Sequence, residues 1–140
     1  NPQWSADGTA LLVEATDEAR IDLINLQTKR QTVLIEGASS ASWSPRGEEI
    51  AYVREDRLGL WSVEDGDKGW IEPLRNSVIT ATFAPAWSPD GRWVLVNTEA
   101  YETVIVETAT NAAHRIGYLP LNYETEVNWM NVAWGDLPAF

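Results

Sequence analysis

The sequence has no cysteine in its 140 residues. This absence excludes disulfide bonds, thiolate catalysis and zinc–thiolate sites, and it leaves the redox compartment open. There is one histidine, His114, so a zinc site built from several histidines is excluded as well. A Ser-His-Asp triad needs a histidine beside a nucleophile and an acid. His114 instead falls in a segment expected to be an outer strand, and no Gly-x-Ser-x-Gly motif occurs. We therefore expect a protein that is not an enzyme.

Basic residues and long apolar runs are also scarce. Ten Lys and Arg residues stand against 21 Asp and Glu residues, which gives a formal net charge of −11. Such a chain repels phosphate backbones and anionic membrane surfaces, so we expect neither nucleic-acid binding nor membrane binding. The longest apolar runs, such as Trp93–Val96, are too short to be inserted across a bilayer. The charge favours either a basic protein partner or simple solubility. No signal-peptide pattern opens the chain, although its first residue is Asn1 rather than Met, which leaves export open.

What the chain does have is a repeated motif. Trp-Ser-Ala-Asp-Gly begins at Trp4, Trp-Ser-Pro-Arg-Gly at Trp43 and Trp-Ser-Pro-Asp-Gly at Trp87, at intervals of 39 and 44 residues, and a degraded copy begins at Trp134. Repeats of about 40–45 residues that contain short strands are typical of β-propeller blades. The residues that define the repeat are Trp4, Asp7, Gly8, Trp43, Gly47, Trp87, Asp90, Gly91 and Trp134.

Each repeat contains the same succession of predicted strands. Three residues after the motif glycine comes an apolar run, at 11–13, 50–53 and 94–96. Short continuous apolar runs indicate strands that are covered on both faces. A second strand is expected at 23–26, 60–63 and 105–108, a more polar outer strand at 31–35, 70–74 and 114–118, and an inner strand at 39–43, 78–87 and 127–134. No helical periodicity is sustained anywhere, so we expect an all-β protein.

The motif residues suit the turn between an inner strand and the next one. A large indole at the end of the inner strand can be buried between neighbouring blades. Serine and aspartate satisfy backbone amides in the turn, and glycine supplies the positive φ. Arg46 replaces the aspartate in the second copy, so that turn is expected to be less well capped.

With its apolar strand and following Leu/Ile-x-Val/Leu strand, Trp-Ser-Pro-Asp-Gly resembles the repeat of TolB-type β-propellers. The resemblance extends from Trp4 to Asp136. Similar repeats occur in periplasmic TolB-like proteins and in the gating propellers of prolyl-oligopeptidase-like and tricorn-like peptidases. The resemblance implies the propeller fold and favours a location outside the cytoplasm. It does not imply one particular function.

The chain is too short for a closed ring. Closed propellers have about 4–8 blades, whereas 140 residues supply about three. We expect residues 4–37 to form a blade without its inner strand, 38–76 and 77–126 to form full blades, and 127–136 to form an inner strand with no blade of its own. Either the chain is a fragment of a longer propeller, with the remaining blades in another chain or in sequence beyond these residues, or two copies form a six-bladed ring. In that ring, residues 127–134 of one copy complete the first blade of the other.

Acidic residues follow the first apolar strand of every repeat. Equivalent connections in a propeller emerge on the same side, so these carboxylates should gather on one rim: Glu14, Asp17, Glu18, Glu55, Asp56, Glu99 and Glu102. Such a rim could attract a basic partner or bind Ca²⁺ through oxygen ligands, with Asp17, Glu18, Asp56 and Glu102 as weak candidate ligands. No EF-hand or nonapeptide calcium pattern is present, and a solvated acidic surface is favoured over a metal site. No other cofactor is expected.

Four of the eight tryptophans lie outside the repeated motif. Among them Trp129, with its neighbours Val127 and Met130, is the best candidate for an interface, because Trp and Met are enriched in interface cores. Core packing explains it equally well. We expect a non-catalytic protein–protein interaction or assembly module that completes its ring with another propeller fragment or with a second copy. The alternative is part of the gating propeller of a peptidase whose hydrolase domain lies elsewhere.

Overall fold

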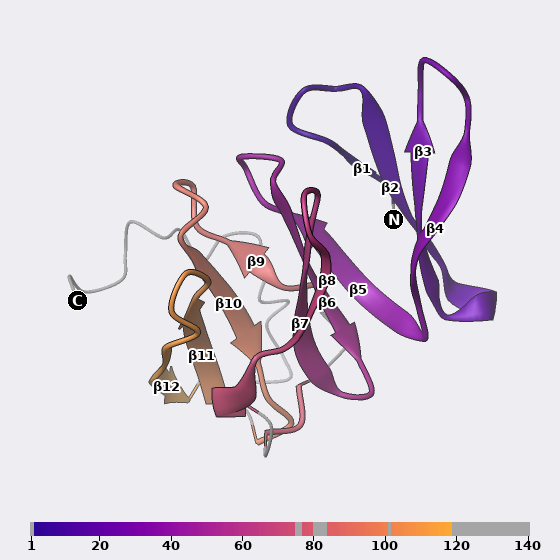
Figure 1. Cartoon of the computed structure of the whole chain (residues 1–140). Coiled ribbons are helices and arrows are strands. Elements are labelled where there is room, and N and C mark those ends of the chain that lie inside the picture. Colours follow the sequence, from indigo (N-terminus) through magenta and orange to yellow (C-terminus); the bar gives the residue numbers. More distant parts are fainter. Residues whose placement is uncertain (1, 75–76, 80–83, 101, 119–140) are drawn as a thin grey trace, which may run out of the picture.

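The computed structural model describes residues 2–74, 77–79, 84–100 and 102–118. These residues form three four-stranded antiparallel sheets that are fanned out in chain order (Figure 1). Two 3-10 helices of three residues each, η1 (Thr16–Glu18) and η2 (Glu72–Leu74), are the helices in the described part of the chain. Neither is long enough to cross a membrane. The predicted all-β fold, a partial propeller of three four-stranded blades, is confirmed.

The first blade comprises β1 (Gln3–Trp4), β2 (Ala10–Ala15), β3 (Arg20–Asn25) and β4 (Gln31–Glu36), paired in that order. This corrects the expectation that its inner strand is missing. Gln3 pairs with Leu12 and Trp4 pairs with Leu11, so the inner strand is present but only two residues long. Among the described residues, no inner strand pairs with the remainder of β2, residues 13–15.

The second and third blades have the same strand order. The second blade comprises β5 (Ala38–Trp43), β6 (Glu49–Arg54), β7 (Arg57–Ser62) and β8 (Gly66–Trp70). The third blade comprises β9 (Ala86–Trp87), β10 (Trp93–Asn97), β11 (Glu102–Glu107) and β12 (Ala113–Tyr118).

The outer strand of the second blade lies earlier than the sequence predicts. It ends at Trp70, where the prediction has it beginning. The Ser62 hydroxyl accepts hydrogen bonds from the amides of Glu64 and Asp65, which closes a tight turn and lets β8 start at Gly66. Pro73 in η2 has no amide hydrogen to extend a strand ladder.

Part of the predicted third inner strand lies within the described residues. Ile79 forms an isolated bridge with Thr98, and β9 covers Ala86–Trp87. The predictions made for residues 127–136, which include Val127, Trp129, Met130 and Trp134, lie outside the described residues.

The hydrophobic core consists of two layers, one on each side of the second blade. Along β6 the side chains alternate between the two faces. Ile50 and Tyr52 pack toward the first blade, against Leu12 and Ile21. Ala51 and Val53 pack toward the third blade, where the cluster includes Leu58, Leu60, Val94, Val96, Val104 and Val106. Because both faces are covered, the apolar run of β6 is continuous.

Candidate functional site

The motif turns are capped by aspartate in the first and third copies. Asp7 accepts hydrogen bonds from the Ser5 hydroxyl (2.7 Å) and the Thr9 amide (3.0 Å). Asp90 accepts the equivalent bonds from the Ser88 hydroxyl (2.6 Å) and the Arg92 amide (3.0 Å). These hydrogen bonds hold the pKa of both carboxyls below its ordinary value, and the bond from the serine hydroxyl has the largest effect in each case. The capping role predicted for Ser and Asp is therefore visible in both turns.

The second copy lacks this cap. Arg46 offers no acceptor to Ser44, whose hydroxyl oxygen accepts one hydrogen bond, from the Glu49 amide at 3.2 Å. The equivalent bond from Ala10 to Ser5 is 2.9 Å. Gly47 still supplies the positive φ, at 73°. The turn keeps its backbone shape with fewer side-chain hydrogen bonds, as the sequence predicts.

The motif tryptophans lie between blades. Trp43 packs against the core between the first and second blades, and Trp87 packs against the core between the second and third. The indole nitrogen of Trp87 donates a hydrogen bond to the Ser42 carbonyl oxygen in the preceding blade (3.1 Å). The indole nitrogen of Trp43 is buried with no hydrogen-bond partner in the described part of the chain.

Polar side chains of the first blade tie it to the inner strand of the second. The Gln3 side-chain amide donates to the Ala41 carbonyl oxygen (2.7 Å) and its oxygen accepts from the Trp43 amide (3.3 Å). Glu14 accepts a hydrogen bond from the Ala41 amide (2.7 Å). Ala41 lies where the β5–β6 register shifts, next to Ser40 at φ 51°. The sequence analysis did not identify Gln3, and it assigned Glu14 to the acidic rim rather than to this contact.

The first blade has an uncovered apolar face, which we call the open face. Its apolar side chains are Trp4, Leu11, Val13, Ile24 and Val33, and the register places Asp22, which accepts hydrogen bonds from Arg20 and Gln31, among them. Cross-strand pairing places these side chains on one side of the sheet, away from the second blade. Trp4 is 64% exposed and Val33 is 43% exposed, and the other three apolar side chains are half-buried.

The equivalent faces of the other blades are covered. Ile50 and Tyr52 of the second blade are 0% exposed against the first blade, and Val94 and Val96 of the third are 0% and 4% exposed against the second. Trp43 and Trp87, which correspond to Trp4, are half-buried. The apolar residues of the open face therefore match those of a blade-to-blade interface in type, but no blade formed by the described residues lies against them.

The acidic connections lie on one side of the fan, as predicted. The connections that follow β2, β6 and β10 all lie at its lower edge in Figure 1. In the described ranges, no three Asp, Glu or His residues gather in a way that could hold an ion. Among the four candidates, Glu18 pairs with Arg20 and Glu102 pairs with Arg115 (3.4 Å). Asp17 and Asp56 are exposed.

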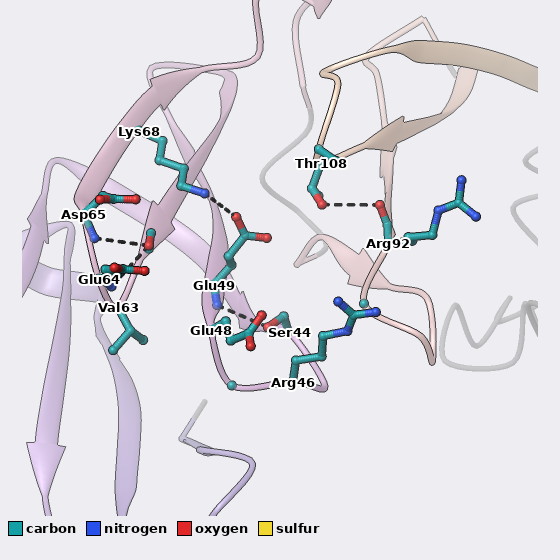
Figure 2. Close-up of a pocket in the computed structure, with 14 residues that line it drawn as sticks. Ser44, Arg46, Glu48, Glu49, Val63, Glu64, Asp65, Lys68, Arg92 and Thr108 are labelled. Carbon is teal, nitrogen blue, oxygen red and sulfur yellow. Dashed lines mark hydrogen bonds and ion pairs between the residues drawn. The ribbon is translucent and has the colours of Figure 1, made fainter.

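A groove of about 660 Å³ lies on the opposite side, between the motif turns and hairpins of the second and third blades (Figure 2). Lys68 on one wall pairs with Glu49 at 2.6 Å. Arg92 on the other wall pairs with Glu107 at 2.8 Å. The Thr110 hydroxyl and Arg92 together hold the pKa of Glu107 below its ordinary value. Arg46 extends along the groove with no interaction drawn to its guanidinium (Figure 2).

Solved structures that resemble this fold include a chain of an enzyme and a β-propeller domain. A chain of hydrazine synthase from Kuenenia stuttgartiensis superimposes with a TM-score of 0.61, at 13% identity, over 81% of this chain and 34% of that chain. The β-propeller domain of Cps50 (Swd1) from Myceliophteria thermophila superimposes with a TM-score of 0.61, at 17% identity, over 84% of this chain and 41% of that chain. No family model matches the sequence, and no curated protein matches it.

This chain thus spans less than half the length of the solved chains that it matches. At such identities the likeness establishes the architecture and leaves activity, ligands and partners open. The described residues form three blades of β-propeller architecture.

Proposed function

We propose that this chain is a non-catalytic assembly module of the TolB-like type, whose open face takes up a further propeller blade from another chain or from a second copy. The motif Trp-Ser-Pro-Asp-Gly supports the TolB-like assignment. The exposure of Trp4 carries the assembly proposal, because the two equivalent tryptophans are each packed between blades.

The energetics favour covering the open face. A tryptophan side chain presents about 150–250 Å² of surface, and apolar burial stabilises by about 25 cal/mol per Å². Covering the exposed part of Trp4 would therefore contribute about 2–4 kcal/mol. Leu11, Val13, Ile24 and Val33 would add to this as they become fully buried.

The short inner strand supports the same proposal. The backbone groups of residues 13–15 on β2 have no inner strand beside them in the described chain. An extended segment from the incoming blade can pair with this edge, in the way strands complete open sheets elsewhere. The sequence of residues 127–134 is a candidate for that segment when the partner is a second copy.

Light scattering coupled to size-exclusion chromatography tests the proposal. The chain has a mass of 15.6 kDa, and we expect a larger particle at high concentration or after addition of a partner recovered by pulldown. Trp4→Ser should weaken that assembly about tenfold or more, because it removes the largest apolar group of the face. Val63→Ser is the matched control, since Val63 is also exposed (57%) but lies on a hairpin of the second blade. An equal effect of the two variants, or a lone monomer with every candidate partner, would contradict the proposal.

A further inference from the structure

The repeat breaks at one position, Arg46. Asp7 and Asp90 each accept hydrogen bonds from a serine hydroxyl and from a backbone amide of their own turn. Arg46 can make neither bond, so the second turn gives up stabilising contacts. A local departure from a pattern with no gain in its own turn is expected at functional positions. The role of Arg46 is therefore to be sought in its contacts outside the turn.

Arg46 is directed into the groove between the second and third blades (Figure 2). Its aliphatic stem lies over Gly91, where an added Cβ would come within 3.2 Å of the Arg46 Cγ. Its charge lowers the pKa of Asp90, after the larger effects of the Ser88 and Arg92 hydrogen bonds. No hydrogen bond or ion pair to the guanidinium is formed by the described residues. The stem is packed, while the five N–H donors of this exposed side chain have no partner among the described residues and can meet a ligand.

Ser44 offers a second unused donor in the same groove. It is only 3% exposed, lines the groove and accepts a hydrogen bond from the Glu49 amide. Its counterparts Ser5 and Ser88 donate their hydroxyl protons to Asp7 and Asp90. The hydroxyl proton of Ser44 has no acceptor among the described residues. The replacement of aspartate by Arg46 thus leaves the Ser44 hydroxyl with one hydrogen bond, from the Glu49 amide, where Ser5 and Ser88 also donate one.

The charges that line the groove determine which ligand group it can bind. Lys68 and Arg92 are already paired with Glu49 and Glu107. Glu48, Glu64 and Asp65 also line the groove, and their charges oppose an incoming anion, so Arg46 has to supply the local attraction. The two unused groups, Arg46 and Ser44, are both donors, and a carboxylate is the group that accepts from a guanidinium fork and a hydroxyl together.

We propose that the groove binds an acidic side chain of a partner protein segment, with its carboxylate taking the place that the aspartate carboxylate occupies in the other two motif turns. Arg46 provides the charge and Ser44 the second hydrogen bond. The site is separate from the open face of the first blade, so a segment can bind here whether or not a ring is completed.

Titration with short peptides tests this. The probe is a blocked pentapeptide with one glutamate among glycines, and its glutamine analogue is the control ligand. With the full chain at low ionic strength, the glutamate peptide should shift the NMR resonances of the Arg46 side chain and the Ser44 amide. The glutamine peptide should bind at least about tenfold more weakly, because the charge-assisted bonds are lost.

Two variants test whether the charges at positions 46 and 48 govern the affinity for the peptide. Arg46→Gln should lower the affinity for the glutamate peptide about tenfold. Glu48→Gln should raise it, because it removes one opposing carboxylate while leaving both donors in place. Both side chains are exposed, so neither change disturbs the core. Equal binding of the two peptides, or unchanged binding by Arg46→Gln, would overturn the proposal.

Discussion

Gly59 in β7 lies directly beneath the ring of Tyr52 in β6: a Cβ placed on Gly59 would come within 2.6 Å of the Tyr52 Cε2. The ring continues across the strand, and its hydroxyl donates to Asp67 in β8 at 2.6 Å. Burial, followed by the contact with Asp67, raises the pKa of Tyr52, so the hydroxyl remains protonated. One side chain thus joins three strands of the second blade, and it can do so because position 59 has no side chain.

Gly59→Ala should destabilise the protein by about 1–3 kcal/mol, the range for an extra methyl group forced into a packed site. Urea unfolding measures the change. The double variant Gly59→Ala with Tyr52→Leu should show strong non-additivity, because the smaller side chain vacates the space over position 59. Additive effects of the two changes would show that the residues do not share this contact.

Tyr52→Phe should reduce the dependence of stability on acid pH. Burial raises the pKa of Asp67, but hydrogen bonds from Tyr52 and the Gly69 amide, together with the charge of Arg54, outweigh it and lower that pKa overall. The stabilisation from Asp67 is present above its unfolded pKa of about 3.9 and is lost as the pH falls through its folded pKa. Without the Tyr52 hydroxyl the two pKa values lie closer together. The free energy of unfolding at pH 6 and pH 3 should therefore differ less in the variant than in the native protein, and an unchanged difference would contradict this.

Trp43→Phe and Trp87→Phe form a matched pair for which we expect unequal losses of stability. Trp87→Phe leaves the Ser42 carbonyl oxygen without the indole donor, which should cost about 1–2 kcal/mol beyond the smaller ring. Trp43→Phe removes a buried nitrogen that has no partner in the described chain, so its cost should be limited to the loss of packing. Denaturant midpoints of the two variants compare them, and a greater loss for Trp43→Phe would refute the assignment of these roles.

Arg46→Asp should restore the cap of the second motif turn. The new carboxylate would accept from Ser44 and from the backbone, as Asp7 and Asp90 do, and stabilise the fold by about 0.5–1.5 kcal/mol. Thermal unfolding at pH 7 measures this. Because the hydrogen-bonded carboxyl would have a lowered pKa, the gain should be present above about pH 4 and decline below it. Arg46→Asn, which supplies an acceptor without charge, is the control and should gain stability without that decline.

Much of this architecture could be predicted from the sequence because each blade repeats the same local sequence pattern. The indoles at Trp43 and Trp87 and the glycines of the motif turns mark the end of each inner strand, and the apolar runs mark the strands between two cores. The start of β8 at Gly66 was missed, since the turn depends on the Ser62 hydroxyl and two amides that a propensity pattern does not show.

The candidate sites were less visible in the sequence. The exposure of Trp4 depends on what lies beside the first blade, which the motif alone does not tell. The position of the Arg46 side chain depends on its contact with Gly91. Gly91 is 45 positions further along the chain and comes close only when the second and third blades pack. Among the weak candidate calcium ligands, Glu18 pairs with Arg20 and Glu102 pairs with Arg115, which lies close to it only once β11 and β12 are paired.

The central claim is that another blade covers the open face. Fluorine NMR of protein labelled with 5-fluorotryptophan tests it most directly, with the Trp4 signal assigned through Trp4→Phe and the solvent exposure of each indole measured by its H₂O/D₂O isotope shift. In the assembled particle the shift of Trp4 should fall to the values of Trp43 and Trp87. A Trp4 signal that stays as solvent-exposed in the assembled particle as in the isolated chain would contradict the account.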